Sequence, residues 1–130
     1  MTGWGLPEKD MIAAARRVAV QGAEVESAEV FIRGAWSCVT EPGDGAAGAV
    51  VSALGAVSAW TALVEQWSTR RVATQCADSG LADISTAVST AWSSGAARWR
   101  SRLDTGAIVS AFELAARSGV ELVVPGGPGW

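Results

Sequence analysis

The stretch Ala91-Trp92-Ser93-Ser94-Gly95-Ala96-Ala97-Arg98-Trp99-Arg100-Ser101-Arg102-Leu103 decides the fold that we predict for this chain. Either serine after Trp92 can cap the backbone N–H groups that the first turn of a helix leaves unpaired, and Gly95 relaxes the steric limits at a bend. The two alanines that follow let another helix approach closely. Each flanking tryptophan offers roughly 150–250 Å² of contact area. We therefore predict a tight turn at residues 92–95 that joins two paired helices.

Length and composition favour a globular helical protein. The chain has 130 residues, of which 49% are hydrophobic and 18% are charged, so disorder over most of its length is excluded. Alanine dominates the apolar residues, whereas strand formers other than valine are sparse. We predict an all-α fold, a three- to four-helix bundle built from antiparallel helical hairpins. Residues 1–119 form a single helical domain in this prediction, and residues 120–130 form an extended tail rich in proline and glycine.

Hydrophobic periodicity places the helices. Turn-forming residues at 41–45 separate the first two, and Asp44 is suited to cap the second one. Gly80 and Gly119 are the natural left-handed residues after a helix. The inward face of the last helix carries Trp99, Leu103, Ala107 and Leu114, joined by Ile108 and Phe112 on a widened stripe. The predicted helices are, in chain order, residues 7–36, 46–76, 81–91 and 96–118.

The residue types exclude several kinds of catalytic and binding site. The chain has no histidine, which rules out Ser-His and Cys-His catalytic pairs and histidine metal ligands. The net charge of −3 argues against binding nucleic acid, although Arg98 and Arg102 lie on either side of Trp99. We expect these arginines to be solvated or to form salt bridges. No catalytic, cofactor-binding or metal-binding residue is predicted, so the chain is interpreted as a non-enzymatic protein that needs no cofactor.

The two cysteines, Cys38 and Cys76, are far apart in the sequence and lack a metal-binding spacing. We expect both to serve as small, partly buried apolar side chains. A disulfide would need an oxidising compartment, and its pairing cannot be read from the sequence.

The seven tryptophans point to association between proteins. Tryptophans at helical spacing are usually core residues, but a short alanine-rich bundle has little room for seven, and an exposed remainder marks a partner surface. The partner is another protein or a second copy of the chain, which contacts the faces of the helices. The predicted interaction residues are Trp92, Gly95, Trp99, Leu103, Trp60 and Trp67.

A membrane helix is an alternative for residues 45–64. This segment has no charged residue and is long enough to span a bilayer, yet it is rich in alanine, glycine and serine. A buried helix of a soluble protein has the same features, and we favour that interpretation. Glu8, Lys9 and Asp10 interrupt the place where the apolar core of a secretion signal would lie, so we expect a cytoplasmic protein or one exported without such a signal.

Residues 92–103 resemble the small Trp-x-Gly helical proteins of type VII secretion. In that family a helical hairpin bends at Trp-x-Gly and continues with small residues, an aromatic residue and a leucine, which Trp99 and Leu103 supply here. Gly95 stands one position later than the signature glycine. The resemblance implies a secretion-associated factor that acts as a homodimer or heterodimer. Other possibilities are a small oligomeric membrane protein and a structural subunit of a phage or another large particle.

Overall fold

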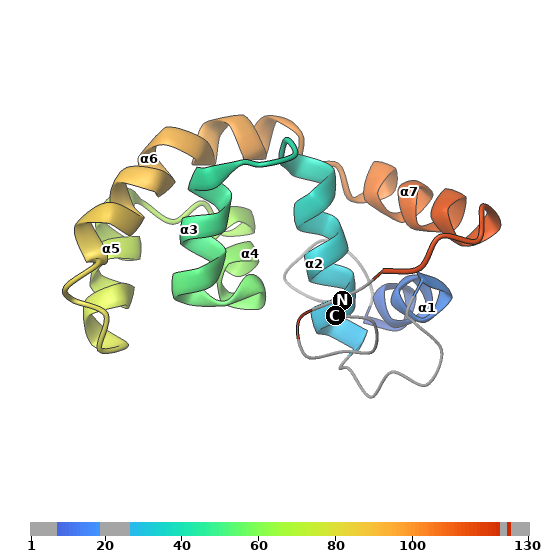
Figure 1. Cartoon of the computed structure of the whole chain (residues 1–130), viewed down its shortest axis with the longest axis horizontal. Helices are drawn as coiled ribbons and strands as arrows, with labels where there is room; N and C mark the ends of the chain where they lie inside the picture. Colours follow the sequence, from blue (N-terminus) through green and yellow to red (C-terminus); the bar gives the residue numbers. More distant parts are fainter. Residues whose placement is uncertain (1–7, 19–26, 123–124, 126–130) are drawn as a thin grey trace. The chain divides into compact units, whose positions relative to one another are not determined.

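The computed structural model describes residues 8–18, 27–122 and 125. These residues form seven helices and no strand, which confirms the all-α class (Figure 1). The arrangement as a bundle of antiparallel hairpins stays a prediction. The helices are α1 (Glu8–Val18), α2 (Ser27–Val39), α3 (Gly45–Leu54), α4 (Ala56–Val64), α5 (Thr69–Asp78), α6 (Ser85–Ser101) and α7 (Thr105–Arg117).

The chain divides into two compact units, and each is described by itself. Unit 1 comprises residues 1–38 and 104–130, and unit 2 comprises residues 39–103. A single helical domain over residues 1–119 stays a prediction. Most of the expected tail lies outside the described residues, which include Val120, Glu121, Leu122 and Pro125 of it.

Unit 2 is built around α6, its longest helix. α3, α4 and α5 all contact α6, as Figure 1 shows. Three tryptophans fill the interior: Trp60 of α4 is 1% exposed, and Trp92 and Trp99 of α6 are 1% and 0% exposed. Val72 and Cys76 of α5 are also fully buried. Burial of these large side chains supplies the main driving force for packing the three shorter helices against α6.

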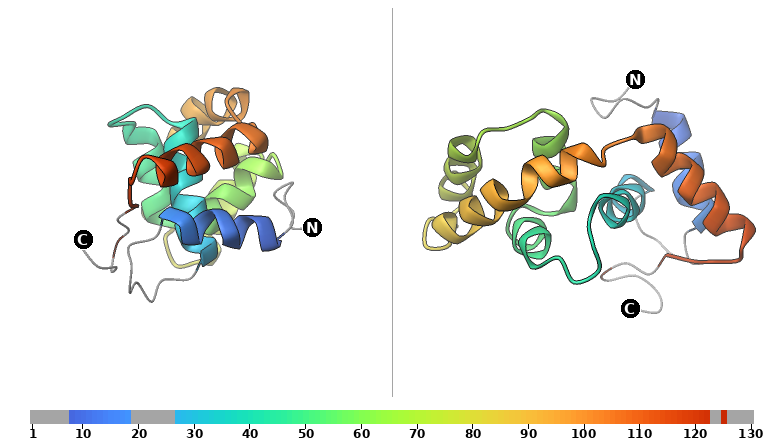
Figure 2. Two further views of the ribbon diagram at one scale, coloured as in Figure 1. Left: turned by 90° about the vertical axis from the view of Figure 1, so that its right-hand side faces the viewer. Right: turned by 90° about the horizontal axis from the view of Figure 1, so that it is seen from above.

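Unit 1 is organised around α7. α1 and α7 lie side by side in both views of Figure 2 and are in contact. Ile108 and Phe112 are the buried residues of α7. The ring of Phe112 lies 5.0 Å from that of Phe31 in α2, measured between centroids. It also covers Gly34, where a β-carbon would overlap the ring. An aromatic contact and a missing side chain therefore bring α2 and α7 together.

The predicted single helix over residues 46–76 is wrong, because the chain bends twice within it. Gly55 has φ 84° and ψ 153°, which no helix allows, and α3 and α4 meet there at 110°. Gln66, with φ 57°, then ends α4, and the Ser68 hydroxyl accepts a hydrogen bond from the Arg71 N–H at 3.1 Å to start α5. Arg70 and Arg71 consequently lie in the first turn of a helix and not near the end of one.

The predicted turn at residues 92–95 is also wrong. α6 runs without interruption from Ser85 to Ser101. Trp92 and Trp99 lie on the same side of this helix, and both are buried. Gly95 is buried because the indole of Trp99, one turn further along, lies over it; a β-carbon at Gly95 would overlap that ring. This glycine therefore provides space for a ring and does not relax a bend. The actual break comes later, where Asp104 caps α7.

Several predicted helix ends are confirmed. Asp44 caps α3, and Gly80 and Gly119 have φ of 80° and 74° directly after α5 and α7 end. The predicted range 7–36 covers α1 and most of α2, which continues three residues further, to Val39. Whether these two form one helix is not decided, since residues 19–26 lie outside the described residues.

The space requirement at Gly95 gives a first prediction. Gly95→Ala should destabilise the fold by about 1–3 kcal/mol, because the ring of Trp99 is fully buried and has no room to shift. Gly48→Ala is the matched control: this helical glycine of α3 is exposed and has nothing within 4 Å of the added carbon. It should stabilise the protein by up to about 1 kcal/mol. Urea denaturation measures the free energy of unfolding of both variants. A stabilised Gly95→Ala variant would refute the conclusion that Gly95 provides space for the Trp99 ring.

Candidate interaction surface

The structure places all six predicted interaction residues in unit 2. Four of them, Trp60, Trp92, Gly95 and Trp99, are buried there, whereas Trp67 and Leu103 are half-buried. Their contacts within the chain are extensive. The rings of Trp92 and Trp99 meet edge to face with centroids 6.1 Å apart, and the indole N–H of Trp92 donates to the carbonyl oxygen of Trp67 at 3.1 Å. A role of these residues in binding another protein stays a prediction.

The most constrained polar group of unit 2 is the carboxylate of Asp44, whose side chain is 7% exposed. Its Oδ1 accepts a hydrogen bond from the Ala47 N–H at 3.1 Å and thereby caps α3. Its Oδ2 accepts from the indole N–H of Trp99 at 2.9 Å and from the guanidinium of Arg98 at 3.0 Å. Burial alone would raise the pKa of Asp44, but these hydrogen bonds and the charge of Arg98 lower it to about 2. One carboxylate therefore joins the start of α3 to α6.

The arginines of α6 are engaged with protein groups. Besides the contact of Arg98 with Asp44, Arg102 pairs with Glu41 at 2.7 Å, so the salt bridges expected for these two arginines are present. Arg100 donates to the carbonyl oxygens of Leu63 at 3.3 Å and Trp67 at 3.2 Å. These carbonyls lie at and just after the end of α4, where a positive charge is favourable. These arginines thus link α6 to the residues that precede α3 and to those at the end of α4.

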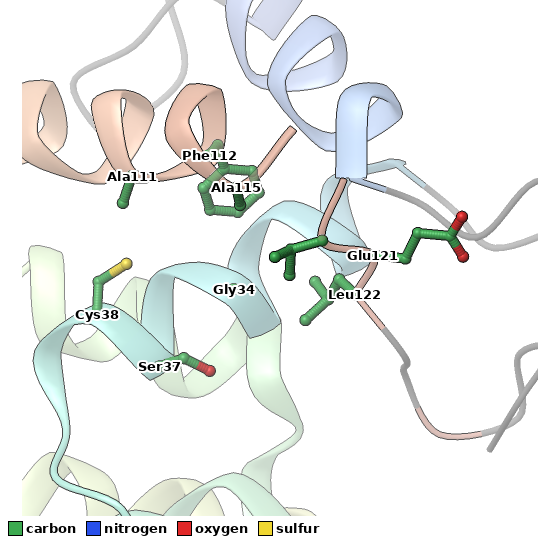
Figure 3. A pocket seen from close by; sticks show the side chains of 9 residues that line it. Gly34, Ser37, Cys38, Ala111, Phe112, Ala115, Glu121 and Leu122 are labelled. Atoms are coloured by element: carbon green, nitrogen blue, oxygen red, sulfur yellow. The ribbon is translucent and has the colours of Figure 1, made fainter. Parts of the chain in front are cut away.

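The most exposed large apolar side chains lie in unit 1. Leu114 of α7 is 59% exposed and Val120, just after α7, is 55% exposed. Val120 also lines a pocket of about 160 Å³ between α2 and α7, shown in Figure 3. Ala111 and Ala115 form its α7 side and lie within one helical turn of Leu114. We call Leu114, Val120 and this pocket the α2–α7 apolar surface.

The expected inward orientation of Leu114 is therefore wrong. The predicted helix runs through Leu103 into α7, but the chain leaves helical geometry at residues 102–104 and restarts at Thr105. Ile108 and Phe112, which the prediction also places on the inward face, are the buried residues of α7, whereas Leu114 is 59% exposed. The cap pattern at Asp104, where the side chain accepts from the Ala107 N–H at 3.0 Å, is the sequence signal that could have located this break.

Both cysteines are free thiols. Cys76 is fully buried in α5, as expected for an apolar core residue, and burial raises its pKa. Cys38 is exposed at the edge of the pocket, with its thiol beside Ala111 in Figure 3. Partial burial raises the pKa of Cys38 too, so both thiols favour the protonated, less reactive form.

Comparisons with known protein families, with curated proteins and with solved structures give no match.

The Asp44 carboxylate gives a second prediction. With a pKa of about 2 in the folded chain against an ordinary 3.8, Asp44 stabilises the fold fully above pH 3.8. That stabilisation is lost as the pH falls from 3.8 towards 2, because the unfolded chain binds the proton first. Asp44→Asn should lower the free energy of unfolding at pH 7 by about 2–3 kcal/mol and remove this part of the acid dependence.

Asp104→Asn is the matched control for that measurement. Asp104 caps α7 through one hydrogen bond to the Ala107 N–H, and asparagine is an equally good cap. Urea denaturation at several pH values between 2 and 7 compares the two variants. If both variants lose the same free energy of unfolding, the contacts of Asp44 with the Trp99 indole and the Arg98 guanidinium contribute nothing to stability.

Proposed function

We propose that this chain is a non-enzymatic helical protein that works by associating with another protein chain. The α2–α7 apolar surface is the observation that supports this proposal best. Leu114 and Val120 are large apolar side chains that remain more than half exposed in a chain whose other large hydrophobic residues are mostly buried. Such side chains beside an apolar pocket are typical of a surface that a protein partner covers.

The chemistry of the partner follows from the surface. The pocket is lined by small and apolar residues of α2 and α7, with Ser37 and Glu121 as its polar members. A helix that presents apolar residues one turn apart fits such a surface, since its side chains can enter the pocket while its polar face stays in water.

In the part of the chain that the structure describes, no three Cys, Asp or Glu residues are grouped to hold a metal ion.

The secretion-associated role implied by the Trp-x-Gly resemblance stays a prediction, and the proposal does not depend on it. The family bends at the signature, whereas residues 92–95 lie within α6. Association through unit 1 needs no bend at that place. A structural subunit of a larger particle also stays a prediction, which self-assembly into species of high mass would support.

Membrane insertion remains an alternative for residues 45–64. No single helix among the described residues is long and apolar enough to cross a bilayer, but α3 and α4 together have the required length and composition, with a bend of 110° between them. Five residues of α4 are buried in unit 2, including Trp60 and Leu63. We therefore favour a core role. Recovery of the expressed protein in the membrane fraction after a carbonate wash would contradict that preference.

Association through Leu114 gives the third prediction. Leu114→Glu should weaken binding to the protein partner by about tenfold or more, because it places a charge where apolar contact is needed. The fold should be unchanged, since Leu114 is 59% exposed. Light scattering after size exclusion measures the complex formed with the products of adjacent genes. Leu114→Met should retain binding because it keeps the surface apolar.

Ser58→Glu serves as the matched charge control, because Ser58 is an exposed residue of α4 in unit 2. It should bind like the natural chain. The proposal fails if the natural chain is a strict monomer that binds none of these gene products, and the assignment of the surface fails if Leu114→Glu and Ser58→Glu bind equally well.

A further inference from the structure

A second groove in unit 1 lies between α1 and α7, the two helices that run side by side in Figure 2. The α1 wall consists of Asp10, Ala13, Ala14 and Arg17. Each of the two alanines is three or four residues from both Asp10 and Arg17, so the four positions follow one edge of the helix. The edge thus has a negative charge at one end, two small residues in the middle and a positive charge at the other end.

The charges along this groove are not neutralised within the described part of the chain. Asp10 and Arg17 are exposed, and so is Glu113, which lies on the α7 wall. None of the three forms a salt bridge with another described residue, whereas Arg98 and Arg102 of unit 2 do. Ala13 is exposed and Ala14 is 5% exposed, so on the α1 wall only small side chains stand between the two charges, which favours the close approach of another helix.

In the reverse direction, the α1 edge presents a positive charge where the forward direction presents a negative one. The edge is therefore complementary to an antiparallel second copy of itself. If a second α1 lies antiparallel across the first, with the two-fold axis between Ala13 and Ala14, Asp10 of each copy faces Arg17 of the other. Ala13 of each copy then faces Ala14 of the other. The two charges are seven residues apart, about 10.5 Å along the axis, so both pairs form in a single register. A two-fold interface requires this kind of reciprocity.

We propose that the α1–α7 groove is the contact between two copies of this chain, with the two α1 helices antiparallel and paired through Asp10 and Arg17. Glu113 adds a negative charge on the opposite wall of the groove. The inference deepens the proposed function and rests on it, since it names a second copy as a partner. The groove differs from the α2–α7 apolar surface in its residues, so the two can be tested separately.

Charge reversal in the full chain tests this contact, with sedimentation velocity over a wide range of concentration as the readout. Asp10→Arg and Arg17→Asp should each weaken dimerisation by about tenfold or more, because each reversal creates two like-charge pairs across the two-fold axis. An equimolar mixture of the two variants should form a heterodimer, in which every pair is again of opposite charge. The double variant should dimerise like the natural chain, and added salt should weaken both complexes.

Arg16→Asp is the matched control for Arg17→Asp. Arg16 is the neighbouring exposed arginine in the last turn of α1, but it does not line the groove. It should leave dimerisation unchanged, and circular dichroism should show all variants folded. Failure of the mixture to pair, or equal effects at both arginines, would overturn the inference.

The outcome for the natural chain separates this inference from the proposed function. A dimer that is insensitive to charge at residues 10 and 17 overturns the groove assignment and leaves association as the function. A natural chain that stays monomeric but binds the product of an adjacent gene also overturns the groove alone. A monomer that binds no such product overturns both.

Discussion

The packing of unit 2 depends on the carboxylate of Asp44. A carboxylate that is 7% exposed is costly unless hydrogen bonds replace the lost water, and here three donors do so. The Ala47 N–H fixes where α3 starts, and the indole of Trp99 is held in one orientation. That orientation places the ring over Gly95 and edge-on to Trp92, whose own N–H reaches the carbonyl of Trp67. One carboxylate thus links α3 to α6 and orients the Trp99 ring, which in turn packs on Trp92.

A ring lying on a glycine is the second constraint, and it occurs in both units. The Trp99 indole covers Gly95 within one helix, and the Phe112 ring covers Gly34 between two helices. In alanine-rich helices most close approaches are between small side chains. The Phe112 and Trp99 rings fit in their positions because the β-carbon is missing at Gly34 and Gly95, so these two glycines determine where those two rings are buried. This explains why the glycines lie inside helices, where their intrinsic propensity is poor.

How much the sequence predicts depends on whether the signal is local. Asp44, Gly80 and Gly119 act on their own helix ends, and these ends were predicted correctly. The bend at Gly55 and the continuous α6 through Gly95 were not, because a glycine flanked by alanines and serines is compatible with either structure. Tertiary contacts decide between them: α4 turns to bury Trp60 against α6, and Trp99 occupies the space above Gly95. Leu114 was misplaced for a related reason, since a periodic pattern does not show where one helix stops and the next begins.

The distribution of tryptophan bears on how association can work. Trp60, Trp92 and Trp99 are buried in unit 2, and the ring of Trp67 is stacked by Arg71 at 4.0 Å, so these indoles are already in contact with their own chain. Trp36 of unit 1 is buried as well, so a partner surface made of the described residues of unit 1 relies on leucine, valine, alanine and charge. Contacts of this kind bury little area, and exposed ion pairs contribute about 0–1 kcal/mol each. Their specificity comes from the order of charges along a helix edge, which penalises a wrong register more than it stabilises the right one. A surface of this composition is therefore suited to reversible and selective association.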